Sequence, residues 1–370
     1  MTSLELYKRI ISGKEKYSYP FQTVLEGDYY DSVRKISSEF ETALKNLDTK
    51  SVDDLNASLD SVKETLPQSL NLANDFLQIK KVVERVIAFL FEGEPAAAYS
   101  ELEKFLLNND AHYTLLLPQL PLIKEMVYYR IRTGLETEEK EPMKQKDLFH
   151  VPFHKRHKIA SMRYSIPGYP ILYVAGSLKM AYQATVKNND DFTYIKIRGK
   201  NDLNFVDLSF PIEGNPKNSD LYSLFIFFPL VVACSMSVAH KKDVYKPEYA
   251  FPQLLTQFVK KNTCFDGISY VPPEIDDCYA VNELRSHDFA IIVRGGVERS
   301  GYDSDLASKY LMTKPLTFME NDCSYQYRKN NIPPWIRDIG TPQDIKHWKC
   351  RFAYLDERDK NEPFLEIDLN

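Results

Sequence analysis

The chain has 370 residues, enough for two domains or one large one. Hydrophobic residues make up 44% and charged residues 27%, as in ordinary globular proteins, and an aromatic share of 13% indicates densely packed cores. The formal net charge of -5 excludes a global basic field, so we expect no nucleic-acid partner.

Residues 1–120 are expected to form a helical N-terminal region, because apolar residues recur there at spacings of three and four. Gly93 and Pro95 separate one such helix from another that begins near Ala97. We expect the helices to pack on one another or on the next domain, with a partner-binding or oligomerising face as the alternative. The two periodic sets are Val33, Ile36, Phe40, Leu44 and Leu47, and Leu72, Phe76, Ile79, Val83, Val86 and Leu90.

The N-terminus and the cysteines both argue against export. The first 20 residues lack a long apolar stretch followed by a cleavage site. The five cysteines are odd in number, widely spaced and never arranged as CxxC, so we expect buried thiols in a reducing cytosol. These features predict a cytoplasmic protein. The cysteines are Cys234, Cys264, Cys278, Cys323 and Cys350.

The segment Tyr129–Arg132 alternates in polarity, and as a strand it would place Arg130 and Arg132 on one face. Arginine is suited to planar, bidentate contact with phosphate or carboxylate groups. By itself, however, a strand-borne arginine is more often part of a surface ion pair.

The charged run at 136–147 predicts a solvated loop, after which short strands mix with helical stretches. We therefore expect residues 121–370 to form an α+β domain. No GxGxxG or GxxxxGK[ST] motif occurs, so neither a Rossmann nor a P-loop nucleotide site is indicated. The expected strands lie at 171–175, 192–197, 203–209 and 289–295.

Three histidines, His150, His154 and His157, lie close together and could suggest a metal site. Pro152 argues against one helix through all three, and no acidic or cysteine ligand is near in sequence, so we expect no metal. A positive loop facing an anion such as a pyrophosphate is the better functional interpretation, and a solvated basic loop is the simplest one. The cations of this loop are Lys155, Arg156 and Lys158.

An apolar segment at 221–240 is interrupted by Ser223, Pro229, Ser235 and Ser237. It barely reaches the roughly 20 residues that a membrane span needs. We expect a buried core helix and no membrane contact.

The stretch from Arg163 to Gln183 combines a basic residue, a turn at Pro167–Gly168, an apolar strand and a helix. Ser177 is a suitable N-cap for that helix. A basic residue, a turn, a strand and a helix that returns a polar side chain together form a workable pocket for phosphate and ribose.

From about residue 125 to 295 the chain resembles the RES-domain family, named for its Arg, Glu and Ser residues. Its members include NAD-degrading toxins related in fold to ADP-ribosyltransferases. The family's YR.R-like strand matches Tyr129, Arg130 and Arg132. Its GRW-then-PG segment, LYLA-type strand, later helix and DGI.Y.S element resemble residues 162–168, 172–175, 252–257 and 265–270. The resemblance implies a mixed, ADP-ribosyltransferase-like α/β core.

Two positions depart from the family pattern. Gln183 stands where the family has its glutamate, and residues 271–273, Val-Pro-Pro, stand near its serine. Cleavage of the nicotinamide–ribose bond has oxocarbenium character, which a carboxylate stabilises; replacing it by an amide would cost on the order of 10² to 10³ in rate. Asp190 or Asp191 could substitute only if the chain returns them to the site. The simpler alternative makes Gln183 a polar residue on an exposed helix edge.

The resemblance implies NAD as substrate or ligand. It implies Arg130, Tyr173 and Gln183 as catalytic residues. Arg130 would bind the pyrophosphate, with Arg132 also expected to hold NAD, and Arg163 would support the pyrophosphate or the ribose. Gln183 would hold the ribose hydroxyls, beside a helix that starts at Ser177. The residues expected to stack on nicotinamide or line the pocket are Tyr164 and Tyr173.

Three functions remain open at this point. The first is an NAD glycohydrolase, phosphorolase or ADP-ribosyltransferase serving as a bacterial toxin or anti-phage defence effector, a role that comes from the resemblance alone. The second is a catalytically silent module that binds NAD or ADP-ribose and signals through the N-terminal helices. The third is an assembly protein without a ligand. We expect the N-terminal helices to regulate, neutralise or oligomerise the protein, with an antitoxin, a regulatory protein or a second copy as partner.

Overall fold

The computed structural model describes residues 1–21, 28–59, 71–107, 113–186, 191–210, 216–273, 286–295 and 301–318, together with 352, 355–356 and 358–369. The chain divides into two units that interleave in sequence. Unit 1 comprises residues 1–121, 159–169 and 204–287, and unit 2 comprises residues 122–158, 170–203 and 288–370. The first cut lies at the expected boundary near residue 120, but two later segments group with the N-terminal helices.

The N-terminal part of unit 1 is helical, as predicted. The two periodic sets lie on α2 and α4 except for Leu47, which follows α2, and the two helices bury Val33, Phe40 and Phe76 among other residues. Both helices begin at a side-chain cap, because Asp28 accepts from the Asp31 N–H and Asn71 accepts from the Asn74 N–H. The helices are α1 (Ser3–Ile10), α2 (Tyr29–Lys45), α3 (Thr49–Ala57), α4 (Leu72–Phe91), α5 (Pro95–Leu106) and α6 (Tyr113–Leu116).

The apolar segment expected as one core helix forms two helices, α8 (Asn218–Ile226) and α9 (Phe228–Ser235). Pro229 lies in the first turn of α9, where its missing N–H costs no helical hydrogen bond, so the chain can bend there. No single helix of the described residues is long and apolar enough to cross a membrane; α8 and α9 qualify only as a pair bent by 65°. Every residue of α9 is buried.

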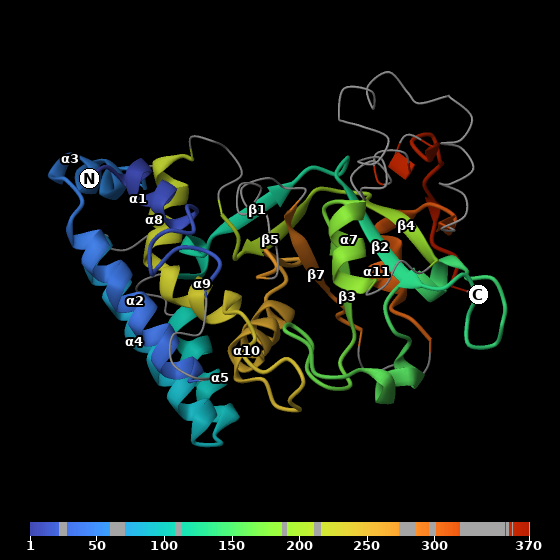
Figure 1. Cartoon of the computed structure of the whole chain (residues 1–370), viewed down its shortest axis with the longest axis horizontal. Coiled ribbons are helices and arrows are strands. Elements are labelled where there is room, and N and C mark those ends of the chain that lie inside the picture. Colours follow the sequence, from blue (N-terminus) through green and yellow to red (C-terminus); the bar gives the residue numbers. More distant parts are fainter. Residues whose placement is uncertain are drawn as a thin grey trace. The chain divides into compact units, whose positions relative to one another are not determined.

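These buried helices explain why unit 1 extends beyond residue 121. α8 and α9 pack against α2 and α4, and α10 (Pro247–Lys261) packs against α9 (Figure 1). The Phe40 and Phe228 rings are stacked with centroids 3.9 Å apart, which joins the N-terminal helices to the later segment in one core.

Unit 1 also contains the strands β1 (Gln119–Leu122), β5 (Leu203–Asp207) and β6 (Gly267–Tyr270). β5 and β6 are parallel neighbours, with Asp207 opposite Ser269. The strand expected at 203–209 is confirmed as β5, and the 265–270 element, for which no strand was expected, contains β6.

Unit 2 is built on antiparallel strands in the order β7-β3-β2-β4-β8-β10, with β9 also paired to β4. The helix α7 (Leu178–Thr185) packs on β2 (Figure 1). Parallel and antiparallel pairs together with separate helices confirm the α+β class. The strands are β2 (Val127–Thr133), β3 (Ile171–Ala175), β4 (Phe192–Gly199), β7 (Asp288–Ile292), β8 (Tyr310–Met312), β9 (Leu316–Phe318) and β10 (Leu365–Glu366).

Short helical turns complete unit 2. The 3-10 helix η2 (Gln145–Leu148) ends the charged run expected as a loop, and η3 (Phe153–Lys158) carries the basic segment. The helix α11 (Ser304–Ser308) follows β7 in the described chain.

The cysteines do not all follow the expectation of buried thiols. Cys234 is buried in α9, but Cys264 is exposed, because it lies in the turn between α10 and β6. Cys278, Cys323 and Cys350 lie outside the described residues.

A buried carboxylate in unit 1 gives a test of the core. The Tyr222 hydroxyl donates to Asp75 Oδ2 at 2.6 Å, and Tyr113 donates to Asp75 Oδ1 at 3.2 Å. Tyr222→Phe leaves one oxygen of a buried carboxylate without this donor, so we expect a loss of about 1.5–3 kcal/mol in the free energy of unfolding, measured by urea denaturation. Tyr245→Phe, at a tyrosine that is 62% exposed, is the control and should change it by less than about 0.5 kcal/mol. Equal stability of the two variants would contradict this account.

Candidate functional site

The strand β2 is held unequally by its two neighbours. It pairs with β4 from Val127↔Arg198 to Thr133↔Phe192, but in the described structure its register with β3 is limited to Tyr129↔Ala175. β3 is paired along its other edge with β7 from Ile171 to Ala175. In the described structure, β2 therefore has no further register pair with β3 beyond Tyr129, at the point where Arg130 follows.

Arg130 reaches across this unpaired edge. Its Nη1 donates to the Tyr173 carbonyl at 2.6 Å, which brings together two of the predicted site residues. Its Nε is enclosed and has no hydrogen-bond partner. No carboxylate among the described residues forms an ion pair with it. Arg130 is therefore a partly buried cation whose guanidinium keeps an unused donor.

The surroundings of Arg130 disfavour its charge without removing it. Burial lowers the pKa of Arg130 to about 10, and the positive charge of Arg132 acts in the same direction. The guanidinium is still protonated at neutral pH. A buried cation without an anionic neighbour is costly, and a bound anion would relieve that cost.

Arg132 lies on the same face of β2, as the alternation predicted, but it is exposed. Its Nη1 donates to the Asp147 carbonyl in η2 at 2.7 Å, so a main-chain oxygen orients it. Its role toward an anion stays a prediction.

His150 is buried between Phe153 and Tyr302, at ring distances of 5.3 and 5.5 Å. Its Nε2 accepts from the Asp303 N–H at 2.9 Å, and this assigns the proton to Nδ1, which donates to the Val151 carbonyl at 2.8 Å. Burial lowers the pKa of His150 to about 4, and the charges of Arg130 and Arg156 act in the same direction. The ring is therefore neutral at physiological pH.

Asp303 is committed to the main chain around this histidine. Its Oδ1 caps α11 by accepting from the Leu306 N–H at 2.9 Å, and its Oδ2 accepts from the Gly295 N–H at 2.7 Å. A Cβ at Gly295 would lie 3.0 Å from the Asp303 carboxylate, so a larger residue there would crowd this contact. Asp303 therefore shapes the region without forming an ion pair with Arg130.

The basic segment contributes charge near His150, since Arg130 and Arg156 both lower the pKa of that ring. The Arg156 guanidinium lies 4.8 Å from the Phe153 ring centroid. Lys158 pairs with Glu138 at 2.7 Å, so one cation of the segment is neutralised in an exposed salt bridge. The interpretation as an anion-facing loop stays a prediction.

The three histidines of this segment do not converge. His150 is buried and uses both nitrogens within the core, whereas His154 and His157 are exposed. Within the described ranges no three His, Cys, Asp or Glu side chains gather as metal ligands.

The helix α7 begins and ends close to the predicted positions. The Ser177 Oγ accepts from the Met180 N–H at 3.3 Å, which confirms its role as N-cap. Tyr182 packs on Phe192 of β4 at a ring distance of 5.5 Å. Gln183 is exposed in the last turn of the helix, and no hydrogen bond joins it to any other described residue. Its role toward a ribose stays a prediction.

Arg163 and Tyr164 belong to unit 1, and both are buried there. Arg163 Nη1 donates to the Cys234 carbonyl at 3.0 Å, and its guanidinium lies 5.3 Å from the Tyr249 ring centroid. The Tyr164 ring packs against Tyr270 at 4.7 Å. Within their own unit, both side chains support the core at the ends of α9 and β6.

Sequence reasoning missed a buried polar cluster beside β5 and β6 in unit 1. Ser209 and Ser269 lie 3.4 and 3.3 Å from His287 Nδ1, and Ser209 donates to Asp207. Burial raises the pKa of Asp207 from 3.8 to about 6. The parallel pairing of β5 with β6 places Asp207 opposite Ser269, and this pairing is the feature that could have indicated the cluster. His287 comes from a segment that is distant in sequence, so no local pattern indicates it.

The chain was compared with protein-family models, solved structures and characterised relatives. No family model and no solved structure matches it. It is 27% identical over 327 aligned residues to a Bacillus subtilis (strain 168) protein described as "Putative toxin YopC", covering 79% of this chain and 73% of that protein.

The neutral state of His150 gives a prediction of pH-dependent stability. The unfolded ring protonates near pH 6.5 and the folded ring near pH 4, so this stabilisation is complete above pH 6.5 and is lost as the pH falls toward 4. We expect a loss of about 3 kcal/mol over that range from this group. Asp207 acts in the opposite direction between about pH 4 and 6, so matched variants are needed to isolate the effect.

The matched variants are His150→Gln and His154→Gln, the second at an exposed histidine of the same segment. Denaturant unfolding at pH 7 and pH 4.5 should show that His150→Gln removes part of the pH dependence, while His154→Gln retains the wild-type slope. Identical slopes in both variants would show that His150 is not held neutral by the fold.

Proposed function

We propose that this chain is a RES-like, NAD-consuming toxin in which Arg130 binds the pyrophosphate of NAD. The observation that carries the proposal is the Arg130 guanidinium, which keeps a buried, unused Nε–H donor in the described structure. It lies in the Tyr129–Arg130–Ile131–Arg132 segment, the portion of the sequence that resembles the first strand of the RES family.

A pyrophosphate suits this environment better than a single carboxylate. It carries two negative charges and several acceptor oxygens, which can accept from the planar guanidinium of Arg130 while Arg132 and Arg156 supply further positive potential. His150 contributes no charge because it is neutral, and Asp303 is occupied by main-chain donors.

The proposed reaction is hydrolysis at the nicotinamide–ribose bond. Water attacks C1′ of the ribose, the bond to the ring nitrogen breaks, and its electron pair neutralises the pyridinium to release nicotinamide; the water proton passes to solvent. Gln183 would orient the ribose hydroxyls but would not oppose the growing positive charge, so we expect slow turnover. Phosphate or a protein side chain in place of water would give phosphorolysis or ADP-ribosylation.

The toxin role draws on two similarities. One is the RES-like order of motifs, and the other is the alignment to the B. subtilis protein described as a putative toxin, which spans most of both chains. An antitoxin or regulatory protein is the partner that such a role would require.

A second candidate function is a silent module that binds NAD or ADP-ribose. The amide at position 183 favours it, because the family position for a catalytic carboxylate holds no charge. Arg130 likewise lacks a carboxylate partner within the described part of the chain. Binding would then be retained without cleavage.

The test is to measure nicotinamide release from NAD and binding of ADP-ribose by the purified chain and its variants. Arg130→Ala should weaken ADP-ribose binding by about 10- to 100-fold, the value of one charge-assisted contact. Arg130→Lys should retain only part of the wild-type affinity for ADP-ribose, because an ammonium group lacks the planar, forked donors of a guanidinium. Arg34→Ala, at an exposed arginine of α2, is the matched control and should bind like wild type.

Gln183→Glu separates the two candidates. Nicotinamide release by the wild-type chain, lost in Arg130→Ala, supports the NAD-consuming enzyme. Binding without release, with cleavage gained in Gln183→Glu, supports the silent module. If neither NAD nor ADP-ribose binds, or if Arg130→Ala binds as wild type does, the proposed function is wrong.

A further inference from the structure

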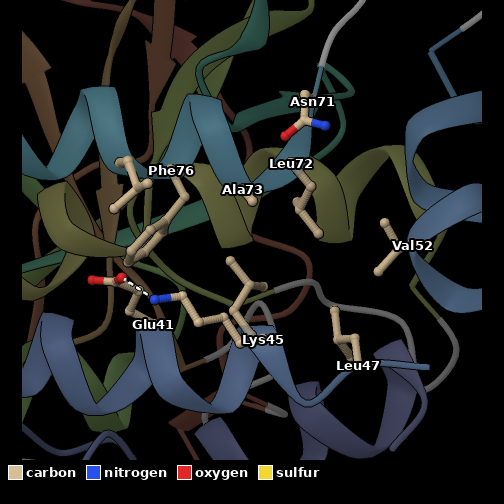
Figure 2. A pocket seen from close by; sticks show the side chains of 10 residues that line it. Glu41, Lys45, Leu47, Val52, Asn71, Leu72, Ala73 and Phe76 are labelled. Carbon is tan, nitrogen blue, oxygen red and sulfur yellow. Dashed lines mark hydrogen bonds and ion pairs between the residues drawn. The ribbon is translucent and has the colours of Figure 1, made fainter. Parts of the chain in front are cut away.

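A small pocket opens between the N-terminal helices of unit 1, in a region that the proposed function does not use. It lies between α2, α3 and the start of α4, and its volume is about 160 Å³. Figure 2 shows Leu47, Val52 and Leu72, which come from three different segments, pointing toward one shared space.

The walls of this pocket are apolar and its rim is charged. Leu44, Leu72 and Phe76 are buried and form the inner wall. At one end of the rim, Glu41 pairs with Lys45 at 2.7 Å and with Lys80 at 2.8 Å (Figure 2 shows the Lys45 pair). The hydrogen bonds from Lys45 and Lys80 lower the pKa of Glu41, so it stays charged.

The volume decides what kind of occupant fits. Pockets for cofactors and drug-sized ligands usually enclose about 300–1,000 Å³. A cavity of about 150 Å³ lined by Leu, Ile and Phe holds one benzene-sized group. The pocket of 160 Å³ therefore matches one large apolar side chain, such as the anchor residues that dominate binding at protein interfaces.

The rim charges decide what should flank that side chain. Two lysines surround one glutamate, which leaves one excess positive charge, and Lys45 is 66% exposed. An acidic neighbour of the anchor would meet Lys45, whereas a basic neighbour would be repelled. This complementarity favours an acidic segment over a basic or neutral one.

From these observations we infer that the pocket is a docking site for a second polypeptide, which inserts one Phe or Leu side chain flanked by Asp or Glu. The inference is independent of the proposed NAD chemistry, because Arg130 and the pocket belong to different units. It gives the N-terminal helices a role in binding a partner protein.

The test uses the full chain and a fluorescein-labelled, alanine-based helical peptide of about 15 residues, with one central Phe and Glu residues one helical turn before and after it. When the chain is titrated into the labelled peptide, anisotropy should show saturable binding with a Kd of about 0.1 mM or tighter. Replacing the peptide's Phe by Ala should weaken binding at least about tenfold. Ala73→Phe, which fills the pocket from its exposed wall, should do the same.

If circular dichroism shows that Ala73→Phe does not fold, two charge-reversal variants still test the inference. Lys45→Glu should weaken binding several-fold, and Lys50→Glu, at an exposed lysine of α3 that does not line the pocket, should bind like wild type. Absence of saturable binding when the chain is titrated to about 1 mM, or equal binding by Lys45→Glu and Lys50→Glu, would overturn the inference. Tighter binding of 4-phenylbutyrate than of the peptide would also overturn it, in favour of a small aromatic acid.

Discussion

Arg130 is a cation that has no ion-pair partner among the residues that the structure describes. β2 is fully paired with β4 but joined to β3 at one register position, and Arg130 occupies the edge where the second ladder is missing. Its Nη1 satisfies the Tyr173 carbonyl, while its Nε remains enclosed without a partner in the described structure. Desolvating a guanidinium is costly, and an anion beside it would offset part of that cost.

The groups around Arg130 keep it positive and available. Asp303 could have paired with it, but its two oxygens accept from the Leu306 and Gly295 main chain. His150 could have added a cation, but the Asp303 N–H holds its Nε2 as an acceptor. Arg130 therefore keeps its charge without an ion-pair partner among the described residues.

The sequence predicted most of the regular elements, because their periodicity is local. The sets containing Phe40 and Phe76 lie on α2 and α4, and the strand at 171–175 is β3 with the same bounds. Ser177 was identified as an N-cap from residue type alone, and its bond to the Met180 N–H confirms it. The apolar composition of residues 221–240 indicates that the segment is buried. It does not indicate that the segment forms two helices with a bend before Pro229.

The site was only partly predictable, for a physical reason. The alternation of residues 129–132 gave the common face of Arg130 and Arg132, but whether a carboxylate lies opposite depends on residues far away in sequence. His150 was considered as a metal ligand because three histidines lie close together, whereas its partner Asp303 comes from a distant segment. The assignment of segments to units likewise followed long-range packing, such as Phe40 on Phe228, that no local pattern contains.

The most direct measurement is the ¹H–¹⁵N resonance of the Arg130 Nε–H group, assigned by its loss in Arg130→Lys. On addition of ADP-ribose, the account predicts that this resonance moves downfield and its exchange with solvent slows, because the enclosed donor gains a phosphate oxygen. An unchanged Arg130 Nε–H resonance at saturating ADP-ribose would show that the ligand binds elsewhere and would contradict the assignment of this arginine as the anion-binding residue.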